Sequence, residues 1–126
     1  MFGIALEDFF EGIKANTSKK LIFYMAIAMT VSIEALSITF LKDSIQHGSL
    51  IYLALIGYVL TALVFREALE LGPMGVANAL WNCGTIIVIS LVGMIAYGDT
   101  YTNMQKLGIA LAVASTICMI TSDVSL

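Results

Sequence analysis

The chain carries few charges, two cysteines and almost no proline. Of its 126 residues 60% are hydrophobic and only 12% are charged, with one proline and a net charge of −3. So small a charge gives no reason to expect nucleic acid as a partner. Cys83 and Cys118 both fall inside apolar runs, without metal-ligand spacing or the clustering of a secreted disulfide framework.

Motifs for chemistry are also missing from the sequence. It contains no recognisable nucleophile–base pair, phosphate-binding loop or cluster of metal-ligating residues. We therefore expect neither an enzyme nor a bound cofactor or metal. A single proline suits a chain built mainly of helices.

Long, nearly charge-free stretches dominate what the chain does contain. A soluble domain this short could not bury so much apolar surface, because small domains keep a large surface-to-volume ratio. Hydrocarbon is the expected solvent instead. A helix needs about 20 residues to cross a hydrocarbon layer of about 30 Å. Apolar segments of this kind occur at about 21–40, 49–69, 73–97 and 104–121.

The links between these segments are short, which forces neighbouring segments to run antiparallel. Helices are required because lipid cannot satisfy loose backbone groups, and each segment is too long for a barrel strand. We therefore predict an all-α, multi-pass integral membrane protein of the cell (plasma) membrane. Its residues 21–126 form one four-transmembrane-helix bundle in contact with membrane lipids.

Residues 1–20 form a separate amphipathic tail in this reading. Its acidic residues argue against a secretory signal, which needs a basic start followed by an apolar core. Either a helix lying on the membrane surface or a frayed tail fits the pattern. The apolar side chains that recur at helical spacing, with charges opposite, are Phe2, Leu6, Phe9, Phe10 and Ile13.

Glu34 is the outlier of the sequence because it lies within the first span, roughly 5 Å from its midpoint by helical rise. No basic residue stands one turn away. An acidic residue at mid-membrane costs about 2.5–3.5 kcal/mol, so it normally faces a cavity and has a function. Burial disfavours its ionised form, so it can hold a proton or, when ionised, a cation. The alternative is a protonated glutamate in a structural hydrogen bond.

Polar and aromatic residues of other spans could join Glu34 in a site. Thr30 and Ser37 share its helical face. An aromatic face beside a carboxylate suits an organic cation through the ring quadrupole, although such stripes also serve in helix–helix packing. The second span offers Tyr58, Thr61 and Phe65 on one face, and the third offers Asn78, Trp81, Asn82 and Thr85.

The fourth span carries no ionisable group within its apolar stretch. Gly108, Ala112 and Ser115 line one side of it. Small side chains let helices approach closely in lipid, so we interpret this span as a dimerisation helix.

The pattern resembles the small multidrug resistance family of bacterial drug/proton antiporters, over about Leu21 to Ile120. Three features carry the resemblance: Glu34 followed eight residues later by Lys42, the stretch 72–81 (GPMGVANALW), and Gly98 closing the third span. The resemblance implies that Glu34 binds proton and substrate in turn. It also implies an antiparallel dimer joined by the fourth helices.

The resemblance further implies which side chains line the pocket. Tyr58 and Trp81 would form an aromatic wall, and Thr30 and Ser37 would line the pocket from the first span. Asn78 stands where the family typically has tyrosine. Around Cys83-Gly84-Thr85 one glycine remains where the family's glycines let the third helix bend. Substrates smaller or more polar than flat aromatic drugs are therefore expected.

The distribution of basic residues bears on dimerisation. An antiparallel homodimer needs a chain that inserts both ways, and basic residues on one side oppose this. If they fix one orientation, a differently oriented sister chain becomes the expected partner. Lys14, Lys19, Lys20 and Arg66 lie on the side of the N-terminus, and Lys42 and Lys106 lie on the other.

The leading hypothesis is a proton-coupled antiporter subunit that exports small organic cations, such as quaternary ammonium, guanidinium-like or drug cations. Two other hypotheses stay open at this point. The chain could be a non-transporting or heterodimeric partner of a sister transporter, as its unusual third span and its tail suggest. It could also export polyamines or lipid-linked amines.

Overall fold

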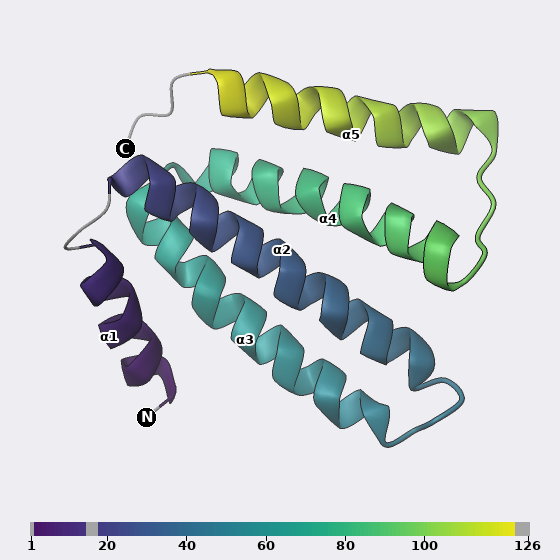
Figure 1. The fold of residues 1–126 in the computed structure, drawn as a ribbon, viewed down its shortest axis with the longest axis horizontal. Coiled ribbons are helices and arrows are strands. Elements are labelled where there is room, and N and C mark those ends of the chain that lie inside the picture. Colours follow the sequence, from purple (N-terminus) through teal and green to yellow (C-terminus); the bar gives the residue numbers. More distant parts are fainter. Residues whose placement is uncertain (1, 15–17, 123–126) are drawn as a thin grey trace.

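A computed structural model describes residues 2–14 and 18–122 and consists of helices (Figure 1). No strand occurs among these residues. Of the predicted tail, residues 1 and 15–17 lie outside the described residues. The helices are α1 (Phe2–Lys14), α2 (Lys19–Asp43), α3 (Leu50–Leu71), α4 (Met74–Ala96) and α5 (Asn103–Thr121).

The helices α2 to α5 are each long and apolar enough to cross a membrane. Backbone groups in hydrocarbon must be satisfied within the segment, and a continuous helix does this. Side-chain caps begin two of these helices: Ser18 accepts from the backbone of Leu21 at the start of α2, and Thr102 forms a capping box with Gln105 at the start of α5. The predicted all-α membrane fold with four membrane-spanning helices is confirmed.

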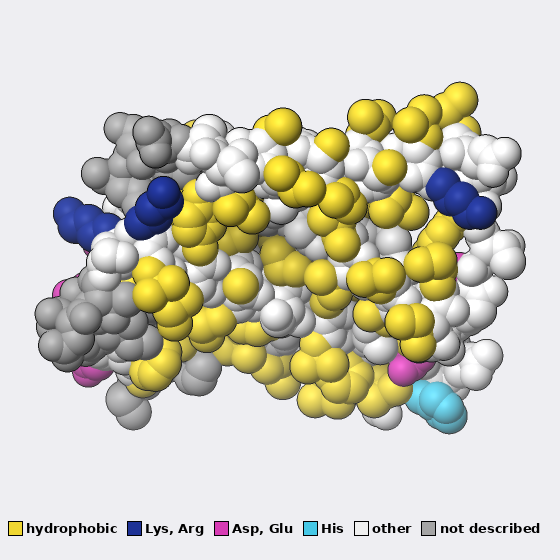
Figure 2. Space-filling model, turned by 45° about the horizontal axis from the view of Figure 1, so that its top comes forward, with side chains coloured by type: hydrophobic (Ala, Val, Ile, Leu, Met, Phe, Trp, Pro, Cys, Tyr) yellow, Lys and Arg dark blue, Asp and Glu magenta, His cyan; other side chains and the backbone are white. Residues whose placement is uncertain are grey.

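The surface is also that of a membrane protein. Large apolar side chains such as Leu55, Val59, Leu111 and Ile117 are exposed along α3 and α5. Figure 2 shows hydrophobic side chains along the length of one face, with lysine and arginine gathered towards its two ends. Such an exposed apolar surface is stable where lipid chains, not water, surround it.

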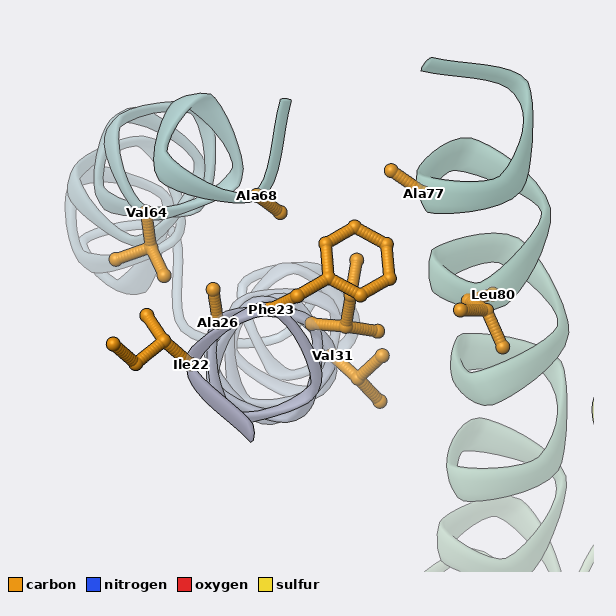
Figure 3. Packing of buried hydrophobic residues seen from close by; sticks show 9 residues of the cluster. Ile22, Phe23, Ala26, Val31, Val64, Ala68, Ala77 and Leu80 are labelled. Carbon is orange, nitrogen blue, oxygen red and sulfur yellow. The ribbon is translucent and has the colours of Figure 1, made fainter. Parts of the chain in front are cut away.

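The helix α2 is central to the packing. It lies beside α3 along its length and against α4, whereas α5 contacts α4 alone among the described helices (Figure 1). Buried apolar residues gather where α2 begins, α3 ends and α4 begins. Figure 3 shows this core, in which Phe23 of α2 lies between Ala68 of α3 and Ala77 of α4. From there α3 and α4 diverge (Figure 1), so the bundle is packed most tightly at one end.

Two glycines let neighbouring helices approach α2 closely. A Cβ at Gly57 of α3 would overlap the Ser37 hydroxyl and lie 2.9 Å from Ser37 Cβ. A Cβ at Gly84 of α4 would lie 2.9 Å from a methyl group of Val31. Close approach at small residues is the main packing device between helices in lipid. The α2–α3 and α2–α4 contacts therefore depend on these glycines.

The helix α1 packs at the tightly packed end, against α2 and α3. Leu6 lies against the core, and Glu7 Oε1 pairs with Arg66 Nη1 of α3 at 2.6 Å. Ile4 and Phe9 remain exposed. The predicted helical tail is thus attached to the bundle. Its location at a membrane surface stays a prediction.

At the opposite end of the bundle, where α2 ends, a side-chain hydrogen bond joins α2 to the residue after α4. The Tyr97 hydroxyl, just after α4, donates to Asp43 Oδ1 at 2.7 Å. This hydrogen bond, with smaller contributions from desolvation and from the charge of Asp43, raises the pKa of Tyr97 above its ordinary value. The contact lies at the end of the α2–α4 interface, between the last residue of α2 and the residue that follows α4.

We predict that Gly57→Ala destabilises the bundle, because the added methyl group overlaps Ser37. Overpacking of this kind costs about 1–3 kcal/mol. Thermal unfolding of the detergent-solubilised protein measures the loss. Gly75→Ala in α4 is the matched control, since open space surrounds its Cβ position. Equal unfolding temperatures for the two variants would contradict the packing described above.

We also predict that Tyr97 ionises at higher pH than in a variant that lacks the Asp43 charge. The phenol form is the one that donates to Asp43, so its stabilising contribution is complete below the unfolded pKa of about 10. It disappears as pH rises through the higher folded pKa. Ultraviolet titration of the wild type and of Tyr97→Phe gives, by difference, the ionisation curve of Tyr97. The same pair of titrations in proteins that also carry Asp43→Asn should give a curve with its midpoint at lower pH. An unmoved midpoint would refute the assignment.

Candidate functional site

Glu34 lies in the middle of α2, half-buried, with its carboxylate directed at α4. Its Oε2 atom accepts from the indole Nε1 of Trp81 at 2.6 Å and from the hydroxyl of Thr85 at 2.8 Å. Trp81 and Thr85 are four residues apart on α4 and so share one helical face. One carboxylate oxygen is therefore held by two donors from a single neighbouring helix.

Neither donor carries a charge. Glu34 forms no ion pair with the described residues, and its second oxygen, Oε1, accepts no hydrogen bond from them. An isolated carboxylate in an apolar medium is costly unless it is paired or hydrogen-bonded, and hydrogen bonds to ionised groups are the stronger ones. Neutral donors thus hold one oxygen of the carboxylate, and the other oxygen has no donor among the described residues.

Aromatic rings of α3 and α4 adjoin this carboxylate. The rings of Phe65 and Trp81 lie 4.4 Å apart between centroids, at an angle of 42°. Tyr58 of α3 is near enough for electrostatic interaction with Glu34, and 37% of its surface is exposed. Of the two predicted aromatic residues, Trp81 thus contacts Glu34 directly, and Tyr58 lies on the neighbouring helix α3 without a hydrogen bond to it. Phe65, which the sequence places on the same face of α3 as Tyr58, packs beside Trp81.

The predicted polar neighbours on α2 are placed differently. Thr30 and Ser37 are 0% and 1% exposed, and each hydroxyl donates to a carbonyl of its own helix, at 2.8 Å to Ala26 and 2.7 Å to Ile33. Their protons are therefore not directed at Glu34. Both residues pack within the bundle, Ser37 against Gly57.

Asn78 also stands apart from the carboxylate. It is exposed on α4, one turn before Trp81, and donates no hydrogen bond to a described residue. On α5, Ala112 is buried, whereas Gly108 and Ser115 are exposed, and open space surrounds the Cβ position of Gly108. A dimer interface on α5 stays a prediction.

Thr85 belongs to the polar face predicted for the third span, but the sequence did not single it out as a ligand of Glu34. The helical period places it on the face of Trp81, but periodicity does not reveal whether a hydroxyl bonds its own helix or another. Its place four residues after a tryptophan on a polar face is the signal that was available. Gly84, beside it, brings α4 close to Val31 of α2 and so brings Thr85 within reach of Glu34.

Comparison with known proteins identifies the family. The family model described as Small Multidrug Resistance protein matches residues 21–112, which is most of the chain. The chain belongs to the small multidrug resistance family. It is also 30% identical to a multidrug transporter of Pseudomonas aeruginosa over 96 residues, which cover 75% of this chain and 87% of that relative. No solved structure matches the chain significantly.

Membership of the small multidrug resistance family makes the chain a multi-pass membrane transporter at the level of the family. The matched region contains α3, α4 and α2 from Leu21 onward, and therefore Glu34 and its two donors. The helix α1 lies outside it. In the segment Cys83-Gly84-Thr85, where family members have glycines that let this helix bend, α4 is an uninterrupted helix here.

Proposed function

We propose that this chain is a subunit of a proton-coupled antiporter that exports small organic cations across the plasma membrane, with Glu34 as the shared site. The observation that supports it best is the environment of the Glu34 carboxylate in the middle of α2. Two neutral groups donate to it, and no basic residue among the described ones pairs with it. Intramembrane carboxylates without a fixed partner mark ion and substrate pathways. The relative's name, multidrug transporter, agrees with this class of function.

Exchange follows from competition at one group. A protonated Glu34 is neutral and cannot attract a cation, whereas an ionised Glu34 can hold one against the rings of Trp81, Phe65 and Tyr58. Binding of a cation therefore requires release of the proton, and return of the proton displaces the cation. The hydrogen bonds to Oε2 keep the side chain in place in both states, since Oε1 is the oxygen that changes partner.

A single copy leaves this site incomplete. The helices α3 and α4 diverge from their common end, and α5 contacts α4 alone among the described helices (Figure 1). A second copy would close the open side, so we propose a dimer in which two Glu34 side chains share one chamber. Antiparallel pairing through α5, with Gly108, Ala112 and Ser115 at the seam, is the arrangement expected from the family resemblance.

Two related functions stay open. More basic residues lie at the end of the bundle where the chain begins than at the other end: Lys14, Lys19, Lys20 and Arg66 against Lys42 and Lys106. The tail helix α1 is attached at the first of these ends through Glu7 and Arg66. This end-to-end asymmetry favours a single orientation and hence a heterodimer with a sister chain, in which this chain need not transport on its own. The exposed Asn78 in place of an aromatic wall favours small polar cations, with polyamines or lipid-linked amines as further candidates.

We predict that Glu34→Gln abolishes proton-driven uptake of cations into reconstituted vesicles, because an amide neither releases a proton nor attracts a cation. Uptake of a radiolabelled quaternary ammonium or guanidinium compound under an imposed pH gradient measures this. Asp8→Asn, an exposed acid outside the membrane-spanning helices, is the matched control and should transport normally. Undiminished uptake by Glu34→Gln would refute the proposed function.

A second experiment separates a homodimer from a heterodimeric partner. The purified chain alone, reconstituted into liposomes, should transport a cation against a proton gradient if two copies suffice. Competition by guanidinium, quaternary ammonium and polyamine compounds then defines the substrate class. Absence of transport by the chain alone, restored on adding a sister chain, would identify the heterodimer instead.

A further inference from the structure

Thr85 differs from the other hydroxyl residues of the membrane helices. Thr30, Ser37, Thr61, Ser90 and Thr116 each donate to the carbonyl four residues earlier in their own helix. This is the usual way for a hydroxyl to satisfy its proton in a helix. Among the hydrogen bonds that the structure gives for these helices, only the Thr85 hydroxyl donates to a side chain of another helix.

The Thr85 hydroxyl also has a possible acceptor in its own helix, to which it does not donate. The carbonyl of Trp81 lies four residues earlier and could accept the proton, as in the other hydroxyl residues. The hydroxyl instead donates to Glu34 Oε2 at 2.8 Å, beside the indole donor of Trp81. Thr85 therefore belongs to the site at Glu34 and not only to helix packing.

A hydroxyl has one proton but two lone pairs. Since the Thr85 proton is given to Glu34, its lone pairs are directed elsewhere and can accept from a third group. Glu34 Oε1, in the carboxyl group to which this hydroxyl donates, accepts no hydrogen bond from the described residues. One hydrogen-bonded unit thus offers two acceptors, a carboxylate oxygen and a neutral hydroxyl. A planar cation with several N–H groups matches such a pair, because it can donate to two oxygens at once.

We propose that Thr85 is a specificity-determining residue, whose hydroxyl holds Glu34 Oε2 and accepts an N–H of the bound cation, so that the site favours guanidinium and primary ammonium compounds over quaternary ammonium. This inference rests on the proposed function, because it assumes that a cation binds at Glu34. A quaternary ammonium has no N–H and gains nothing from the hydroxyl. It interacts with the carboxylate and the aromatic rings alone.

The test compares two probes with the same aromatic body, benzylguanidinium and benzyltrimethylammonium. Their dissociation constants are measured by calorimetry on the detergent-solubilised full chain. Thr85→Val keeps the shape and removes the hydroxyl, and it should shift the ratio of the two dissociation constants about tenfold against benzylguanidinium. Such a shift is expected because the variant loses a hydrogen bond to a charged group, and a tenfold change corresponds to about 1.4 kcal/mol.

The ratio separates specificity from a merely structural role. A loosened Glu34 would weaken both probes equally and leave the ratio unchanged, whereas Thr85→Ser keeps the hydroxyl and should restore the wild-type ratio. If Thr85→Val does not fold, Thr85→Ala is the second hydroxyl-free variant. An unchanged ratio in a folded, hydroxyl-free variant overturns this inference.

Glu34→Gln separates failure of this inference from failure of the proposed function. If that variant loses both probes while Thr85→Val leaves the ratio unchanged, only the role of Thr85 is refuted. If it binds both probes like the wild type, the proposed function fails as well.

Discussion

The hydrogen bonds between Glu34 of α2 and the pair Trp81 and Thr85 of α4 are the interaction on which the rest of this structure depends. They place an acidic group inside hydrocarbon without a basic residue to neutralise it. Any other arrangement would have to bury the carboxylate unsatisfied or pair it permanently. The neutral donors stabilise the carboxylate inside the bundle without forming an ion pair, and exchange of a proton for a cation, as proposed above, needs such a group.

The packing of the helices follows from the same need. To reach Glu34, α4 must lie close to α2, and Gly84 removes the side chain that would keep them apart. The aromatic contact between Phe65 and Trp81 then fixes the indole from the side of α3. Three helices thus converge on one carboxyl group, and α5, which contacts only α4 among them, is left to meet lipid or another subunit.

Much of this was predictable from the sequence. The thickness of the hydrocarbon layer fixes the length of a spanning helix, so apolar length alone predicts four spans. A single acid in such a run identifies Glu34. The positions of Thr85 and Ser37 show the limit, since both are hydroxyl residues on polar faces, yet one donates to Glu34 and the other to its own backbone. That difference arises from the distance between helices, which periodicity does not encode.

Contacts between residues far apart in the sequence could not be predicted from it either. Glu7 and Arg66 lie 59 positions apart, and Asp43 and Tyr97 lie 54 apart, so neither pair follows from helical spacing. The sequence predicts that the tail can form an amphipathic helix. It does not predict that the tail attaches to α3.

The uneven placement of the core has a mechanical consequence. Buried apolar residues hold α2, α3 and α4 together at the end where α2 begins (Figure 3), while at the far end the link from α2 to α4 rests on a phenol and a carboxylate. Local opening is least costly where few apolar contacts are lost. Separation of α4 from α2 therefore costs less free energy at the end with Asp43 and Tyr97 than at the end with the apolar core. Glu34 lies between these two ends, so such a motion would open the bundle towards the carboxylate from one side only.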